Sequence, residues 1–313
     1  MPSDLEKSIS KTLAYFDIFD YPLTATEVWK WLYRPHSPVT LAKVRECLSS
    51  GQWLQEKISA TEGFYCLKGR ENIFLLRKQN NNWAERKFAK VVRLVKFYRY
   101  LPFIKLIAVC NSLAYSNARN DSDIDLFVVT SKDKIWLARF WAVLLVQLLG
   151  LRQTDKKRKD TFCFSFFIDE DYLNIQSILL GQHDIYSAYW VQQVLPVFDP
   201  ENIYPKFLAA NQWYKEYLPN SYANKFVYEV KATRSSRLAS KILGFIFDPP
   251  FLSRGLYGLQ RKFQSSIIGR NLQQIVNVDT RVIVNEHMLK FHANDRRDFF
   301  YHQWRDRVKQ LFA

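Results

Sequence analysis

Two aspartates, Asp123 and Asp125, are the residues whose type and spacing most clearly suggest chemistry in this 313-residue chain. They stand at the start of an apolar, β-branched segment, residues 124–130. Side chains two positions apart in a strand point the same way, so both carboxylates are expected on one face while Ile124 and Leu126 enter the core. Two such carboxylates can bind a hard divalent cation, Mg²⁺ or Mn²⁺, which would bridge to the phosphates of a nucleoside triphosphate (NTP).

A second polar group precedes this pair at a fixed distance. A β-branched run, residues 104–109, is followed by Asn111 and Ser112, and ten residues separate Ser112 from Asp123. This arrangement resembles the DNA polymerase β-like nucleotidyltransferase superfamily. The motif of that superfamily is an apolar strand, Gly-Ser or Gly-Gly, about ten residues, and then two aspartates that alternate with apolar residues. The resemblance covers roughly residues 85–175.

The resemblance implies a role for each matching residue. Asn111 and Ser112, with the backbone N–H groups beside them, would hold triphosphate oxygens, and Asp123 and Asp125 would hold the metal ions. An acceptor hydroxyl would attack the α-phosphate, and pyrophosphate would leave. Catalysis of this kind rests mostly on positioning and on neutralising charge.

The chain departs from the family pattern at two places. Asn111 stands where the family carries glycine, although asparagine tolerates left-handed backbone better than most residues. The family often uses a third carboxylate on an adjacent strand, but the strand expected at residues 161–168 has Ser165 near its middle and no acid. If that strand continues, Asp169 shares a face with Ser165. We therefore expect Asp169 to be the third catalytic carboxylate.

The elements around this centre suggest three regions. Residues 1–70 read as a winged-helix-like domain, because an apolar stripe over residues 5–16, a capping box that begins at Thr24, and Ser37-Pro38 predict three helices. A hairpin with strands at residues 53–58 and 64–67 completes this arrangement. The third helix of a winged helix can enter a DNA major groove.

The remaining chain predicts a mixed α/β (α+β) fold. Residues 71–175 give a long helix, the strand pair around the aspartates, a helix at about 134–149 and a third strand, which together form a small mixed-sheet nucleotidyltransferase core. Residues 176–313 read as a helical C-terminal region.

The composition favours a folded protein with a polyanionic partner. Hydrophobic residues make up 48% of the chain, which is enough for a large core, and the formal net charge is +15. Lysine and arginine attract phosphates, so an NTP and nucleic acid are the partners we expect.

Nothing in the sequence suggests a membrane or an oxidising compartment. The apolar run at residues 140–151 is too short to span a bilayer, and the N-terminus lacks the layout of a signal peptide. The four cysteines lie far apart without a CxxC pair, so neither a zinc ribbon nor a disulfide framework is indicated. We expect a cytoplasmic protein.

Two other hypotheses stay open. A non-catalytic nucleic-acid-binding or regulatory protein could keep the fold and lose part of the site, as Asn111 and the missing acid in residues 161–168 suggest. A winged-helix transcription regulator with an unrelated sensor domain would instead depend on residues 1–70.

Two weaker signals lie near the C-terminus. His287 and His292 are five residues apart, which does not place them on one helical face, so the zinc-protease pattern is not met. Several basic residues could contact phosphate or form a solvated face: Arg254, Arg261, Lys262, Lys290, Arg296 and Arg297.

Overall fold

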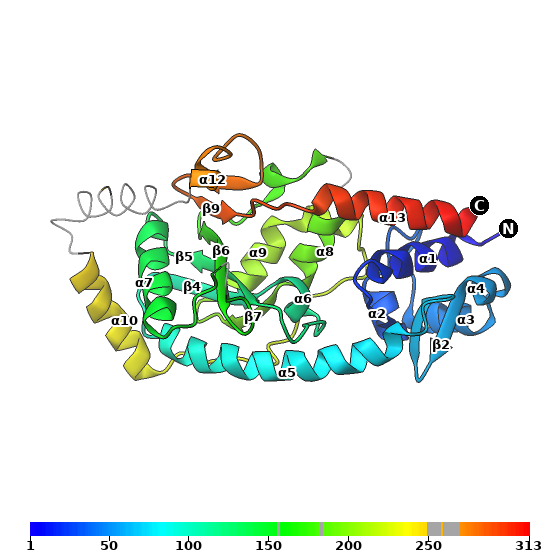
Figure 1. Ribbon diagram of the computed structural model, residues 1–313, viewed down its shortest axis with the longest axis horizontal. Helices are drawn as coiled ribbons and strands as arrows, with labels where there is room; N and C mark the ends of the chain where they lie inside the picture. Colours follow the sequence, from blue (N-terminus) through cyan, green and yellow to red (C-terminus); the bar gives the residue numbers. More distant parts are fainter. Residues whose placement is uncertain (155–156, 182–183, 249–257, 259–269) are drawn as a thin grey trace.

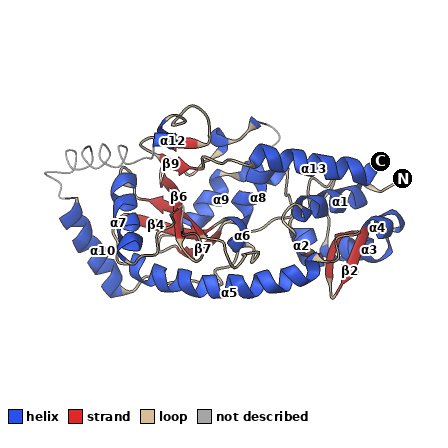
Figure 2. Cartoon of the chain, viewed as in Figure 1, coloured by secondary structure: helices blue, strands red, loops and turns tan. Residues whose placement is uncertain are grey.

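The computed structural model describes residues 1–154, 157–181, 184–248, 258 and 270–313, and it shows an elongated molecule with mixed α and β structure (Figures 1 and 2). One sheet of six strands and one of three strands form its β structure. Among the basic residues singled out above, Arg254, Arg261 and Lys262 lie outside the described residues.

The larger sheet has the order β7-β4-β5-β6-β9-β8. Strands β5 and β6 run parallel, and every other neighbouring pair is antiparallel. The strands that carry the expected core were predicted within one residue. The bounds of all six strands are Ile104–Val109 for β4, Ile124–Thr130 for β5, Phe162–Asp169 for β6, Leu195–Phe198 for β7, Val282–Val284 for β8 and Met288–Phe291 for β9.

Three of these six strands, β7, β8 and β9, come from the region that we expected to be helical. That expectation is therefore incomplete, although most elements after residue 175 are helices. The physical reason is that each of the three strands has only three or four residues. A short apolar run cannot be told from part of a buried helix by its periodicity, and only its distant partner in the sheet makes it a strand.

Helices cover both faces of the larger sheet (Figure 1). The side chains of β5 alternate as the strand period requires. Ile124, Leu126 and Val128 pack in the cluster that contains α5 and α7 residues, whereas Phe127 and Val129 pack in the cluster that contains α8 and α9 residues. The main helices of this part are α5 (Ile73–Tyr98), α7 (Ile135–Leu148), α8 (Ile185–Gln193), α9 (Ile203–Ala210) and α10 (Arg234–Phe247). No described helix is both long enough and apolar enough to cross a membrane.

The first part of the chain forms helices against the three-stranded sheet β1-β3-β2. The capping box at Thr24 is present, with the Thr24 hydroxyl accepting from the Glu27 N–H and the Glu27 carboxylate accepting from the Thr24 N–H. The elements are α1 (Asp4–Asp17), β1 (Leu23–Thr24), α2 (Ala25–Lys30), α3 (Leu41–Ser50), α4 (Gln52–Lys57), β2 (Ile58–Thr61) and β3 (Phe64–Leu67).

Two boundaries in this part differ from the prediction. Helix α3 begins after Thr40, whose hydroxyl caps the Lys43 N–H, and not at Ser37-Pro38. Residues 53–57 belong to helix α4 rather than to a strand. In α4 a single side chain, Leu54, is buried, and the good helix formers Gln55, Glu56 and Lys57 follow it, so local propensity favours the helix.

The last helix, α13 (Arg297–Phe312), returns to the beginning of the chain and lies beside α1 (Figure 1). The Trp304 indole N–H donates to the Lys11 carbonyl at 3.0 Å, and the Arg307 guanidinium binds the Asp17 carboxylate at 2.7 Å. One hydrophobic cluster contains buried residues of α1, β5, α8 and α13. The N-terminal helices therefore share a core with the larger sheet.

Candidate metal centre

The end of β4 and the start of β5 bring the two predicted groups together. These strands are antiparallel, with Val109 opposite Leu126, and the Cys110 N–H donates to the Asp125 carbonyl at 3.2 Å. A short helix, α6 (Asn111–Ala114), begins directly after this contact. The Asn111 side-chain amide donates to the Asp125 carboxylate at 2.9 Å. Asn111 and Asp125, which are 14 residues apart in the sequence, are therefore in contact in the fold.

Asp123 and Asp125 form a compact cluster with Cys163. One side-chain atom of each residue lies within 4.8 Å of the others, and all three are half-buried. Cys163 enters the cluster because it lies directly opposite Asp125 in the parallel β5–β6 pair. It is the side chain that occupies the place beside the pair where we expected a third carboxylate.

Two of the three side chains, those of Asp123 and Asp125, are suitable ligands for a hard cation. Mg²⁺ commonly takes one or two carboxylates from a protein and fills its other positions with water and phosphate oxygens. Burial and the negative charge of Asp125 raise the pKa of the Cys163 thiol, so at neutral pH it is an uncharged thiol. Because a thiol is a poor ligand for Mg²⁺, the oxygens of Asp123 and Asp125 would hold the ion.

The charges of Asp123 and Asp125 also favour a bound cation. Burial, and then the charge of Asp123, raise the pKa of Asp125 to about 6, while hydrogen bonds from Asn111 and Cys163 oppose the rise. Two adjacent carboxylates repel each other, and a divalent cation between them would remove that cost.

Asn111 is fixed in an unusual conformation. Its φ is 57°, in the left-handed region that glycine occupies most readily. Its side-chain oxygen accepts hydrogen bonds from the Trp190 indole N–H at 3.1 Å and from the Tyr186 hydroxyl at 3.3 Å. Because both partners donate, the amide nitrogen must point at Asp125. Asn111 thus connects helix α8 to the carboxylate pair.

The expectation for Asp169 is wrong. Asp169 lies opposite Thr130, five positions along β5 from Asp125, or about 16 Å at the usual rise per residue. Its buried carboxylate binds the His287 ring at 2.8 Å and accepts from the Asp171 N–H. The error arose because β6 runs parallel to β5, so that its beginning, and not its end, lies beside the aspartate pair.

Asp125 lines a cavity of about 670 Å³. This volume is within the range of small-molecule pockets. Its lining includes four aromatic residues, Phe166, Tyr186, Trp190 and Phe300, and four basic residues, Arg158, Lys290, Arg296 and Arg297. A smaller cavity of about 230 Å³ is also lined by Asn111 and includes Ser112.

The basic residues of the larger cavity differ in how freely their charges can meet a ligand. Arg297 is buried in ion pairs with Asp184 at 2.9 Å and with Asp295 at 2.7 Å. Lys290 is also buried, and burial lowers its pKa to about 8. In contrast, Arg158 and Arg296 are exposed at the edge of the cavity. Those two are the cations best placed to meet a phosphate.

Sequence reasoning missed the pairing of Ser165 with His292. The Ser165 hydroxyl and the His292 Nε2 atom are 3.0 Å apart, and both residues line the larger cavity. Burial and the nearby Lys290 charge lower the pKa of His292 to about 3, so its ring is neutral. His287 binds Asp169 instead, so the two histidines have different partners.

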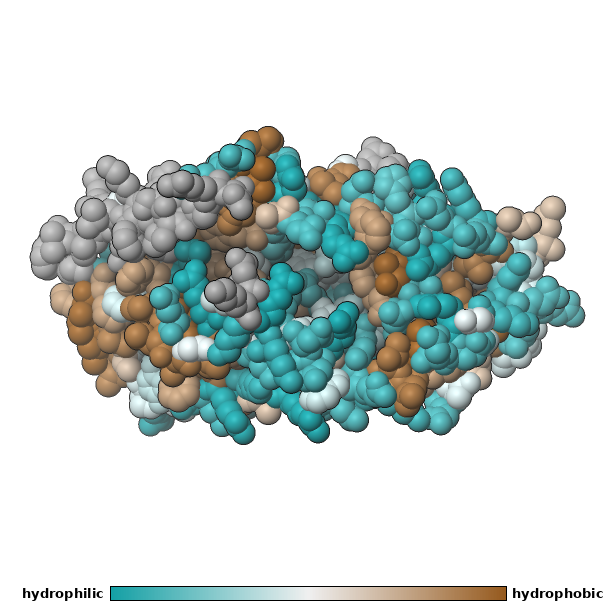
Figure 3. Space-filling view, viewed as in Figure 1, coloured by the Kyte–Doolittle hydropathy of each residue, from teal (hydrophilic) through white to brown (hydrophobic). Residues whose placement is uncertain are grey.

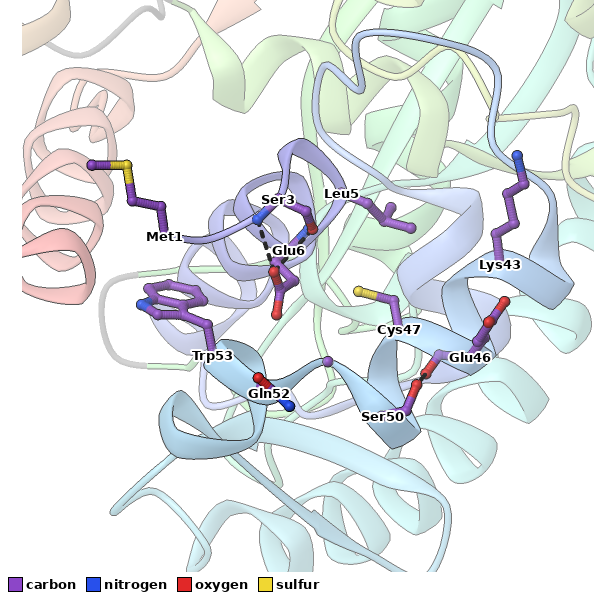
Figure 4. Close-up of a pocket in the computed structure, with 11 residues that line it drawn as sticks. Met1, Ser3, Leu5, Glu6, Lys43, Glu46, Cys47, Ser50, Gln52 and Trp53 are labelled. Atoms are coloured by element: carbon purple, nitrogen blue, oxygen red, sulfur yellow. Dashed lines mark hydrogen bonds between the residues drawn. The ribbon is translucent and has the colours of Figure 1, made fainter.

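A further cavity, of about 560 Å³, lies in the N-terminal part between α1, α3 and α4 (Figure 4). The carboxylate of Glu6 faces it but is already satisfied by the Ser3 N–H and hydroxyl and by the Leu54 N–H. Among the described residues, the group that could hold a metal is the cluster of Asp123, Asp125 and Cys163.

Comparison with known protein families, with curated proteins and with solved structures finds no match to this chain.

Proposed function

We propose that this chain is a divalent-metal-dependent nucleotidyltransferase of the DNA polymerase β-like superfamily. It would transfer a nucleoside monophosphate from an NTP to an acceptor hydroxyl. One observation carries the proposal: Asp123 and Asp125 converge at the start of β5, where Asp125 accepts a hydrogen bond from Asn111 in the turn after β4 and lines a cavity of about 670 Å³.

Each residue of the site would have its own role. Asp123 and Asp125 would hold Mg²⁺ or Mn²⁺, which when bound neutralises charge on the triphosphate. Ser112 and the N–H groups at the start of α6 would bind phosphate oxygens. Asn111 keeps Asp125 in place through its amide, and the exposed Arg158 and Arg296 would attract the triphosphate to the cavity.

A second candidate function is binding without transfer. Cys163 favours it, because an uncharged thiol stands where active members of the superfamily often carry a third carboxylate. Such a protein would be a nucleic-acid-binding or regulatory member of the superfamily. The solvent-exposed Lys43 and Arg45 on α3, which would be the recognition helix of a winged-helix domain, are the residues that DNA would contact.

The proposal includes a cytoplasmic location. The four cysteines, Cys47, Cys66, Cys110 and Cys163, are free, which suits a reducing compartment.

Incubation of the purified protein with Mn²⁺ or Mg²⁺ and each α-³²P-labelled NTP tests the transfer. We expect a labelled product or self-labelling that Asp123→Ala and Asp125→Ala abolish. Asp121→Ala is the matched control, because Asp121 is close in sequence but exposed and bound to Arg119. Metal-dependent nucleotide binding without any labelled product would favour the second candidate, and equal labelling by the wild type and Asp123→Ala would contradict the proposal.

A further inference from the structure

Helix α10 (Arg234–Phe247) presents its small residues to the protein. The Ser240 hydroxyl donates to the Leu101 carbonyl at 3.2 Å, and a Cβ at Gly244 would lie 3.5 Å from Pro102. At the end of the helix the Phe247 ring stacks on Trp141 with 3.8 Å between centroids. These contacts hold α10 on the loop after α5 and on α7.

Four of its large apolar residues face the opposite way, into solvent. The exposed fractions are 62% for Leu238, 52% for Ile242, 64% for Phe245 and 59% for Ile246. These positions are four, three and one residues apart, so they form one stripe along the helix. Hydrophobic surface gathers over α10 at the left end of the space-filling view (Figure 3). A surface helix normally buries such a stripe against its own protein, so this exposed stripe indicates a binding partner outside the molecule.

A second stripe on the exposed side of α10 is basic. Arg234, Arg237 and Lys241 are three and four residues apart, which places them along one edge of the apolar stripe. None of the three makes an ion pair with a described residue. Residues 230–247 contain no aspartate or glutamate. The whole exposed side of α10 is therefore apolar and positively charged.

We propose that α10 docks the protein on an anionic lipid surface, lying in the plane of the interface. An interfacial helix combines large apolar side chains, which enter the boundary of headgroups and acyl chains, with lysine and arginine, which meet anionic lipid. Charge disfavours an antiparallel pairing with a second copy of this chain, because two α10 helices packed face to face in that way would bring their basic stripes together. This inference does not depend on the proposed nucleotidyl transfer.

Co-sedimentation of the full chain with phosphatidylcholine vesicles, with and without phosphatidylglycerol, tests the inference. We expect binding to the anionic vesicles that falls as salt rises. The double substitution Ile242→Ser/Phe245→Ser should weaken it by about a hundredfold or more, since each buried apolar side chain contributes at least about tenfold. Arg237→Gln/Lys241→Gln should weaken binding to anionic vesicles by about tenfold, because each basic residue near the surface contributes several-fold.

The matched control compares two exposed leucines. Leu238→Ser on α10 should weaken binding, whereas Leu75→Ser on α5, where the leucine is 63% exposed, should leave it unchanged. An unchanged thermal midpoint shows that each variant is folded. The inference is overturned if the wild type does not bind anionic vesicles, if Leu75→Ser matches Leu238→Ser, or if the α10 substitutions change only the oligomeric state or the binding of an acidic protein.

Discussion

Asp125 lies beside a second carboxylate in a half-buried position, and its pKa is raised to about 6. Its value in an unfolded chain is near 4. Because the folded value is the higher one, protonation favours the folded state. The stability from the protonated form is fully present below about pH 4 and is lost as the pH rises through about 6. At neutral pH and without metal, the ionised pair therefore destabilises the fold.

Asp125→Asn tests this destabilisation, which comes first from burial of the charge and then from repulsion by Asp123. Without divalent cations we expect the variant to be more stable than the wild type by about 1–2 kcal/mol at pH 7.5 and equally stable near pH 4, because the amide mimics the protonated acid and the linkage maximum of about 3 kcal/mol is reduced by solvent. Thermal unfolding in EDTA at the two pH values measures the difference. Asp121→Asn serves as the control and should bring no gain, since Arg119 lowers the pKa of Asp121. A loss of stability in Asp125→Asn at pH 7.5 would contradict the account.

Cys163→Asp would place a carboxylate opposite Asp125. With three carboxylates the site should bind Mn²⁺ roughly tenfold or more tightly and should transfer nucleotide faster, while the metal-free protein should lose about 1–3 kcal/mol of stability through added repulsion. Metal titration and the labelled-nucleotide reaction measure the two effects. Cys163→Ser keeps the size without the charge and is the control. No gain in metal affinity would mean that Cys163 does not face the metal position.

The carboxylate pair could be predicted from the sequence because strand alternation is local. Cys163 could not. Its place beside Asp125 depends on the parallel register of β5 and β6, which is set by a connection of more than thirty residues that contains α7. The expectation for Asp169 was wrong for the same reason, because the register of β6 against β5 could not be known from the sequence.

At the scale of elements, the long helix α5 holds the loop that leads into the aspartate pair. The Lys87 ammonium is buried and donates to the Ser122 carbonyl at 2.7 Å and to the Asp160 carboxylate at 3.1 Å. Asp160 also binds Lys90 at 2.7 Å. Helix α5 thereby fixes both the residue before Asp123 and the residues just before β6.

Lys87→Met should loosen this connection. We expect a loss of about 2–4 kcal/mol, because the substitution leaves buried acceptors without a donor, together with weaker Mn²⁺ binding at the aspartate pair. Denaturant unfolding and metal titration measure the two effects. Lys90→Met removes an exposed partner of the same carboxylate and should cost less than about 1 kcal/mol. If both substitutions cost the same, Lys87 has no special role.

The long elements and the capping box could be read from the sequence, because α5 and α7 repeat their apolar residues over several turns. The short strands β7, β8 and β9 could not, since their conformation is decided by partners far along the chain. Helix α4 was also missed, because three apolar or aromatic positions between residues 53 and 58 suggested a strand. Local propensity and the hydrogen bond from the Leu54 N–H to Glu6 of α1 favour the helix instead.

At the scale of the whole molecule, α13 ties the end of the chain to its beginning. Trp304 is 8% exposed, and its ring lies 5.0 Å from that of Tyr33. Because the cluster around it also contains residues of the larger sheet, we expect residues 1–70 and the sheet to unfold together.

Trp304→Ala tests this cooperativity. The substitution should cost about 3 kcal/mol and lower the midpoint of one common transition, since a large buried side chain is lost from a shared core. Calorimetry of the wild type and the variant measures it. Phe312→Ala is a control on the same helix, at a more exposed position. Two transitions, of which only one shifts, would show that the N-terminal part is independent.

By the proposed function, Asp123 and Asp125 together hold a divalent cation with a nucleotide. Anomalous scattering from a crystal grown with Mn²⁺ and a non-hydrolysable NTP tests it most directly. We expect manganese within about 2.6 Å of a carboxylate oxygen of both Asp123 and Asp125, with the triphosphate in the cavity that Asp125 lines. Manganese bound elsewhere, or at this position with equal occupancy in Asp123→Ala, would contradict it.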